Sequence, residues 1–285
     1  MMIRLKVPKG YTAVSNGTLK KQFRSEAKYD QFEWFVSYPI NNYNVTFYLG
    51  KFEYFSDSVE IQGDNLLLKY YVLPYNLEKA KTHFEQSKQI LKAYSKFFGK
   101  YPFMRDGFGL VESPYEGMEH QTAIAYGNSY SNVENNTYRK KEFDYIIVHE
   151  AAHEWWGNAV SAVDMADIWI HEGFATYAEF LLVEDVYGKD EYNYEINQKR
   201  KFIFNFWPVV ENYDVNENSF ASNDVYTKGA MILHCLRSTI NNDSLFFKII
   251  RDFFKENEFN VVTTQQFIDL VNQSTGKNFT PFFKK

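Results

Sequence analysis

The chain has 285 residues, of which 45% are hydrophobic and 24% charged, enough to bury a substantial core; this composition excludes a disordered polypeptide. The net charge of −5 and the lack of a long basic stripe argue against binding to nucleic acid or to an anionic membrane. The sequence has no membrane-spanning apolar run and no export signal, so the chain as given is expected to be soluble. Its single cysteine does not decide the compartment, which is either cytoplasmic or, with a signal upstream of Met1, exported.

The first 73 residues are predicted to form strands. Four segments are rich in aromatic and β-branched side chains, and turn residues such as Asn16-Gly17 and Gly63-Asp64-Asn65 separate them. The expected strands cover residues 3–7, 31–37, 44–55 and 66–72.

A change of period at Asn76 predicts a helix. Asn76 is expected to cap it, apolar residues from Ala80 to Phe98 share one face, and Gly99 and Pro102 end it. Two further strands are expected between residues 107 and 127, joined by a polar loop around Pro114.

Beyond residue 127 the pattern is mainly helical. A capping box of Thr263 with Gln266 marks the start of the last helix. The other expected helices cover residues 140–157, 168–187, 190–206, 224–240 and 244–256. The sequence therefore predicts an α+β fold, with a boundary near residue 74.

The segment His149-Glu150-Ala151-Ala152-His153 carries the strongest chemical signal. Histidines four residues apart lie on one face of a helix, where their ring nitrogens can converge on a zinc ion at roughly 2.0 to 2.1 Å. Glu150 is turned about 100° from His149, so it is poorly placed as a ligand but can take a proton from a water that the metal activates. The alternative is a histidine pair that packs on a helix without metal.

A catalytic zinc ion needs a third protein ligand and an open fourth position. Glu172 is the candidate, nineteen residues after His153 in a segment that can run back antiparallel to the first helix. Glu154, His171 and Asp167 are the alternatives.

These residues resemble the gluzincin metallopeptidases, in which a glutamate follows the two histidines at this distance. Gly117-Met118-Glu119-His120 resembles the Gly-x-Met-Glu-Asn motif of the zinc aminopeptidases of peptidase family M1, the family of alanyl aminopeptidases and of leukotriene hydrolase. Here Glu116 stands in place of the family's glycine, and His120 in place of its asparagine. Tyr226-Thr227-Lys228-Gly229 resembles the family's catalytic-tyrosine segment.

The resemblance implies a thermolysin-like, mainly helical catalytic domain that binds one zinc ion. The zinc ligands would be His149, His153 and Glu172, and Glu150 would be the general base. Glu119 would bind the substrate's α-ammonium group. Separately from the resemblance, the strand pattern around Gly117 and Met118 predicts that the backbone there binds the substrate by strand addition. Tyr226 would stabilise the oxyanion. The implied function is removal of the N-terminal residue from short peptides.

The resemblance also implies a truncated member of the family. Residues 1–73 would be the last part of an N-terminal β domain, and residues 74–285 the catalytic domain. Such a β-sheet stub is expected to expose an unpaired edge that favours self-association. Two alternatives to the aminopeptidase stay open at this point: a catalytically weak or inactive peptide-binding remnant, and a thermolysin-like endopeptidase.

Overall fold

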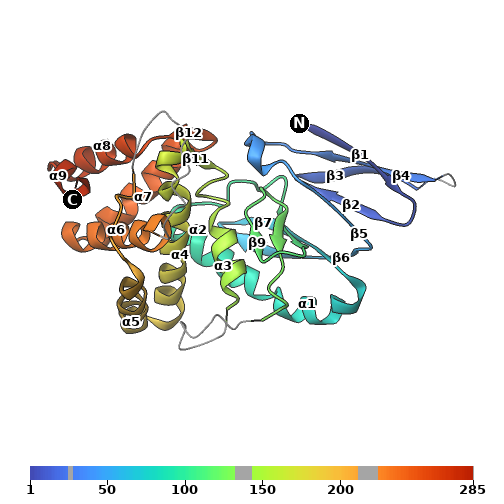
Figure 1. The fold of residues 1–285 in the computed structure, drawn as a ribbon, viewed down its shortest axis with the longest axis horizontal. Helices are drawn as coiled ribbons and strands as arrows, with labels where there is room; N and C mark the ends of the chain where they lie inside the picture. The colour runs from blue at the N-terminus through green and yellow to red at the C-terminus, as the bar shows by residue number, and fades with distance from the viewer. Residues whose placement is uncertain (25–27, 132–142, 211–223, 285) are drawn as a thin grey trace. The chain divides into compact units, whose positions relative to one another are not determined.

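The computed structural model describes residues 1–24, 28–131, 143–210 and 224–284, and the chain divides into two compact units. Of these residues, unit 1 comprises 1–24, 28–92, 101–131 and 143–154, and unit 2 comprises 93–100, 155–210 and 224–284. Figure 1 labels the elements in chain order. Each unit consists of several separate stretches of the chain. The division therefore does not test the domain boundary near residue 74, which stays a prediction.

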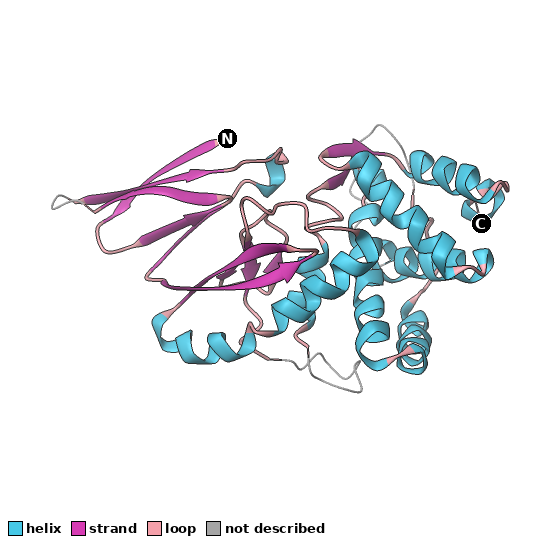
Figure 2. Cartoon of the chain, turned by 180° about the vertical axis from the view of Figure 1, so that it is seen from behind, coloured by secondary structure: helices cyan, strands magenta, loops and turns pink. Residues whose placement is uncertain are grey.

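Unit 1 holds most of the strands (Figure 2). They are β1 (Met2–Pro8), β2 (Thr12–Ser15), β3 (Thr18–Phe23), β4 (Tyr29–Phe35), β5 (Phe47–Gly50), β6 (Glu53–Ile61), β7 (Asp64–Val72), β8 (Phe108–Glu112), β9 (Gly117–Met118) and β10 (Ile124–Tyr126). Strands in unit 1 and helices in unit 2 confirm the predicted α+β class.

The N-terminal strands form two small antiparallel sheets, one ordered β1-β4-β3 and the other pairing β2 with β5. Their inward side chains share one apolar cluster that includes Val14, Phe32, Trp34 and Tyr48. Strands β2 and β3 were not predicted. The strand expected over residues 44–55 is in fact two strands. Strand β5 follows a short 3-10 turn at Asn42–Asn44 and ends at Gly50, and β6 begins at Glu53.

A five-stranded mixed sheet ordered β6-β7-β8-β10-β9 completes unit 1. Its inner strands β7, β8 and β10 run parallel to one another, and β6 and β9 are antiparallel edges. Buried Lys69 on β7 donates hydrogen bonds to the carbonyl oxygens of Gly17 (2.6 Å) and Asp106 (2.7 Å), which ties the turn before β3 to this sheet.

The long helix predicted after Asn76 is two helices, α1 (Leu77–His83) and α2 (Gln86–Phe98). The predicted capping role of Asn76 is wrong, because its side chain makes no capping bond and donates instead to Glu112 Oε1 at 2.6 Å. Gly99 ends α2 with a φ of +109°, a conformation that favours glycine.

The remaining helices agree with the predicted pattern more closely. They are α3 (Tyr145–Ala152) in unit 1 and, in unit 2, α4 (Trp169–Tyr187), α5 (Lys189–Lys199), α6 (Asp224–Ile240), α7 (Asp243–Asn257), α8 (Thr264–Thr275) and α9 (Thr280–Phe283). Unit 2 also pairs two short parallel strands, β11 (Val160–Ala162) and β12 (Asn260–Val262). The capping box of Thr263 and Gln266 is confirmed.

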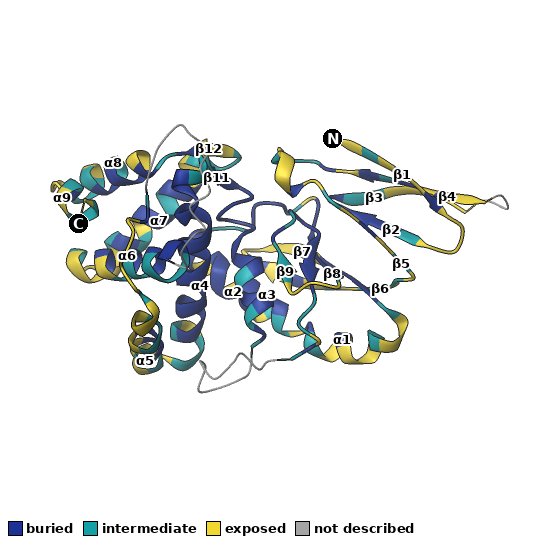
Figure 3. Cartoon of the chain, viewed as in Figure 1, coloured by how far each residue is buried: buried dark blue, intermediate teal, exposed yellow. Residues whose placement is uncertain are grey.

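Helix α4 is the centre of unit 2. Every residue from Trp169 to Val183 is buried, as Figure 3 shows by its colour. A helix that is buried on all sides needs packing partners around it, and α5 and α6 both contact it. Within the described parts of the chain, no helix is long and apolar enough to cross a membrane.

Candidate active site

Helix α3 carries the histidine motif, and its start is fixed by Asp144. The Asp144 carboxylate accepts the backbone N–H of Ile146 at 3.0 Å and so caps the helix. It also accepts hydrogen bonds from Tyr126 Oη at 2.7 Å and Asn128 Nδ2 at 2.8 Å, and His83 Nε2 lies 2.8 Å away. This buried carboxylate therefore anchors α3 to several other elements of unit 1.

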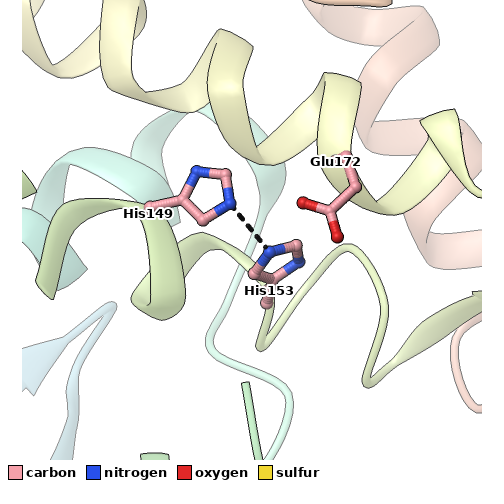
Figure 4. A group of neighbouring side chains, drawn as sticks. All are labelled: His149, His153 and Glu172. Carbon is pink, nitrogen blue, oxygen red and sulfur yellow. Dashed lines mark hydrogen bonds between the residues drawn. The ribbon is translucent and has the colours of Figure 1, made fainter. Parts of the chain in front are cut away.

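The two histidines of the motif lie together as their spacing predicts. Helix α3 ends at Ala152, earlier than the expected residue 157, but His153 keeps helical backbone angles (φ −63°, ψ −19°) and so stays on the face of His149. Their Nε2 atoms are 3.1 Å apart, and Figure 4 shows the two rings turned toward each other. Two nitrogens bound to one tetrahedral zinc ion are separated by about 3.3 Å. The pair therefore has the spacing of two ligands of one ion.

Unit 1 also brings Glu119 next to Glu150. Both carboxylates are buried, and each offers an oxygen within 4.8 Å of the other and of a ring nitrogen of His153. Strand β9 passes so close that a Cβ atom at Gly117 would lie 2.4 Å from Glu150 Oε1. The absence of a side chain at Gly117 is what gives the Glu150 carboxylate its room.

Glu172 lies in the first turn of α4 and is buried. Together with the imidazoles of His149 and His153 in unit 1, it would complete a set of three ligands. Two imidazoles with one carboxylate are a donor set typical of catalytic zinc sites, so these residues fit the ion.

The three alternative ligands have other roles. Glu154 accepts hydrogen bonds from Tyr101 Oη and from the backbone N–H of Thr122. His171 Nε2 accepts the backbone N–H of Ala162 at 2.7 Å. Asp167 Oδ1 accepts both the backbone N–H and the hydroxyl of Thr264 at the start of α8. Among the described residues, no candidate metal group includes any of the three.

Tyr226 lies in the first turn of α6, in unit 2 with Glu172. The glycines that follow these two residues in their motifs, Gly229 and Gly173, meet where the helices cross. A Cβ atom on either glycine would lie 2.9 Å from the Cα atom of the other. The crossing of α4 and α6 thus explains both glycines, whose contact no local sequence pattern indicates.

Alanine at Gly173 or Gly229 is expected to lower the free energy of unfolding. Overpacking costs about 1 to 3 kcal/mol, and the higher helix propensity of alanine returns about 1 kcal/mol. The clash is expected to prevail because a backbone atom cannot rotate away, for a net loss of up to about 2 kcal/mol. Urea denaturation measures each variant and the double variant, whose loss should be less than the sum because both enlarge one crossing. A more stable Gly173→Ala protein would contradict this packing.

A histidine pair on a helix of the strand-rich unit and a buried glutamate on a helix of the following unit are the features by which the chain resembles the gluzincin class. Residues 82–285 match the family model described as the Peptidase family M1 domain. The chain therefore belongs to peptidase family M1.

Several curated relatives are aminopeptidases. The chain is 24% identical to glutamyl aminopeptidase of Bitis rhinoceros, with 94% of this chain and 29% of the relative covered. It is 24% identical to aminopeptidase N of Streptomyces lividans, with 98% and 34% covered. The chain thus spans about a third of the length of these relatives.

Solved structures share the fold. The M1 zinc metallopeptidase from Deinococcus radiodurans superimposes with a TM-score of 0.81 at 20% identity, covering 99% of this chain and 62% of the other. Aminopeptidase A of Legionella pneumophila, in complex with aspartic acid, gives a TM-score of 0.83 at 19% identity, with 99% and 34% covered. At this identity the likeness establishes the fold.

Proposed function

We propose that this chain is a zinc-dependent aminopeptidase that removes the N-terminal residue of short peptides. One observation carries the proposal: the Glu119 carboxylate lies within 4.8 Å of the carboxylate of Glu150 and of a His153 ring nitrogen. A carboxylate so near the reacting groups can pair with the free α-ammonium of a substrate's first residue. An internal peptide bond, which has no ammonium group, would leave this buried carboxylate unpaired.

We assign one zinc ion per chain to His149, His153 and Glu172, whose donor atoms suit that ion. When bound, zinc supplies Lewis-acid chemistry that acidifies a water and polarises the scissile carbonyl. In this assignment the Glu150 carboxylate accepts a proton from the attacking water and passes it to the leaving amine.

The other residues bind and orient the substrate. Glu119 holds the α-ammonium group, and the backbone at Gly117 and Met118, on edge strand β9, offers hydrogen bonds to the extended peptide. Tyr226 donates its hydroxyl hydrogen bond to the oxygen that gains negative charge.

Two chromogenic substrates test the proposal. The zinc-loaded protein is expected to hydrolyse alanyl 4-nitroanilide and to leave N-acetylalanyl 4-nitroanilide intact, because acetylation removes the positive charge that Glu119 binds. Equal rates on the two amides would point to an endopeptidase. Stoichiometric zinc without turnover of either would point to an inactive peptide-binding remnant.

We also propose that the chain self-associates through the small N-terminal sheet. Strands β1 and β3 are its outer strands among the described residues, and they expose Met2 and Phe23. Outer strands offer unpaired backbone groups to a second sheet. Light scattering coupled to gel filtration is expected to show a concentration-dependent rise in mass. A single monomeric mass up to millimolar concentration would contradict this.

A further inference from the structure

The segment that follows Glu119 is bound to the N-terminal strands. Asn16 donates its side-chain N–H to the carbonyl oxygen of Gln121 at 2.7 Å. The backbone N–H of Gly17 donates to Thr122 Oγ1 at 2.8 Å. Since all these residues belong to unit 1, the contacts connect the start of the chain with the amine-binding region.

Tyr48 on β5 makes the most specific of these contacts. Its hydroxyl oxygen lies 2.8 Å from the carbonyl oxygen of Ala123 and 2.7 Å from Nδ1 of His120. A carbonyl can only accept, so we place the hydroxyl hydrogen of Tyr48 on Ala123, and the Tyr115 hydroxyl, which also bonds to Tyr48, is then a donor. Nδ1 of His120 must then carry a hydrogen and donate it to Tyr48.

This count of hydrogens fixes the state of His120. Burial lowers the pKa of His120 to about 4, so the ring is neutral at pH 7. A neutral ring with its hydrogen on Nδ1 has an unprotonated Nε2. The residue next to Glu119 is thus held in one tautomer by a side chain that lies 72 positions earlier in the sequence.

The same segment is held from its other side. Thr122 has a positive φ of 58°, and its backbone N–H donates to Glu154 Oε1 at 2.9 Å. Glu154 Oε2 accepts the Tyr101 hydroxyl at 2.6 Å, and Glu154 follows His153 directly. The backbone after Glu119 is therefore fixed between the N-terminal strands and the end of the histidine motif.

From this geometry we infer that Tyr48 is a positioning residue for recognition of the substrate amine. It orients His120 and anchors the backbone at Ala123, which together hold Glu119 where it binds the ammonium group. The inference rests on the proposed aminopeptidase function and extends it, because it assigns a role in substrate binding to the N-terminal strands. His120, in place of the family's asparagine, is the group through which Tyr48 acts.

The test compares Tyr48→Phe, which removes one oxygen atom, with Tyr54→Phe as the matched control. Tyr54 lies on β6, and its side chain is half exposed. Both zinc-loaded proteins are assayed on alanyl 4-nitroanilide. Tyr48→Phe is expected to raise KM about tenfold, equivalent to about 1.4 kcal/mol, while kcat stays within about twofold and zinc content is unchanged. An amine contact made equally in ground and transition states affects KM in this way. Tyr54→Phe is expected to match the unmodified protein.

Nitrogen-15 NMR of the histidine rings gives a second readout that a merely structural role would not change. His120 is expected to show the Nδ1–H form in the unmodified protein and a mixture of tautomers in Tyr48→Phe. His120→Phe should raise KM as Tyr48→Phe does, and the double variant should add nothing, since both remove one hydrogen bond. If Tyr48→Phe does not fold, His120→Phe alone carries the kinetic test.

An unchanged KM in an active Tyr48→Phe protein would overturn the inference, and so would an Nε2–H form of His120 in the unmodified protein. Failure of the proposed function has a different signature, which is that the unmodified zinc-loaded protein does not hydrolyse the free-amine amide at all.

Discussion

Replacing Glu150 with Gln is expected to lower kcat by a factor of about 10² to 10⁴ while one zinc ion stays bound. Glutamine has nearly the same size and fills the same buried position beside Gly117, but it cannot accept a proton from water. General acid-base catalysis typically contributes an effect of this size. Turnover of alanyl 4-nitroanilide and metal content by mass spectrometry measure the two quantities on one sample.

The Glu150→Gln variant also decides between two possible donor sets. One is the proposed set of His149, His153 and Glu172, and the other is the group of Glu119, Glu150 and His153 within unit 1. If the second group held the zinc ion, the variant would lose metal together with activity. Retained zinc with lost turnover supports the first group, and an undiminished kcat would remove Glu150 from the role of base.

A conservative change outside both groups serves as the control. Glu116 stands next to Gly117 and is exposed, so Glu116→Gln alters the charge of the same loop without touching either donor set. It is expected to leave kcat and zinc content near those of the unmodified protein. A large loss in this control would mean that the loop, and not the general base, is sensitive to substitution.

The amphipathic helices α6, α7 and α8 were predictable because each repeats a 3.6-residue pattern over a long segment, whereas the helix expected over residues 190–206 ends at Lys199. Helix α7 buries Phe246, Ile249, Ile250, Phe253 and Phe254 on one face, and α6 has the predicted bounds. Strands β2 and β3 were missed because β2 has only four residues and β3 alternates weakly around Lys20 and Lys21. The helix break after His83 was missed because Ala80, Phe84 and Leu91 keep one apolar face across it.

Local spacing was sufficient for the histidine pair, since residues four apart on a helix must meet. It was not sufficient for contacts between distant segments. Nothing in the sequence pairs Tyr48 with His120, or Gly173 with Gly229, because each contact exists only when separate elements pack. The role of Asp144 was missed for a different reason: an aspartate before a helix is common, and its other partners come from distant residues.

Loss of His153 is expected to have the largest effect on metal binding. His153 belongs to both possible donor sets, so His153→Ala should abolish stoichiometric zinc and turnover whichever set holds the ion. Removing one of three protein ligands leaves too few to retain a catalytic zinc ion against a chelator. The expected result after dialysis against a weak chelator is less than about a tenth of the zinc of the unmodified protein.

His234 provides the matched control for this experiment. It is half-buried in unit 2, its Nδ1 lies 2.7 Å from the Tyr192 hydroxyl, and it belongs to neither donor set. His234→Ala is therefore expected to keep zinc and activity even if it loses some stability. Full zinc occupancy in His153→Ala would contradict both donor sets at once, because the ion would then have to be held without the one residue that they share.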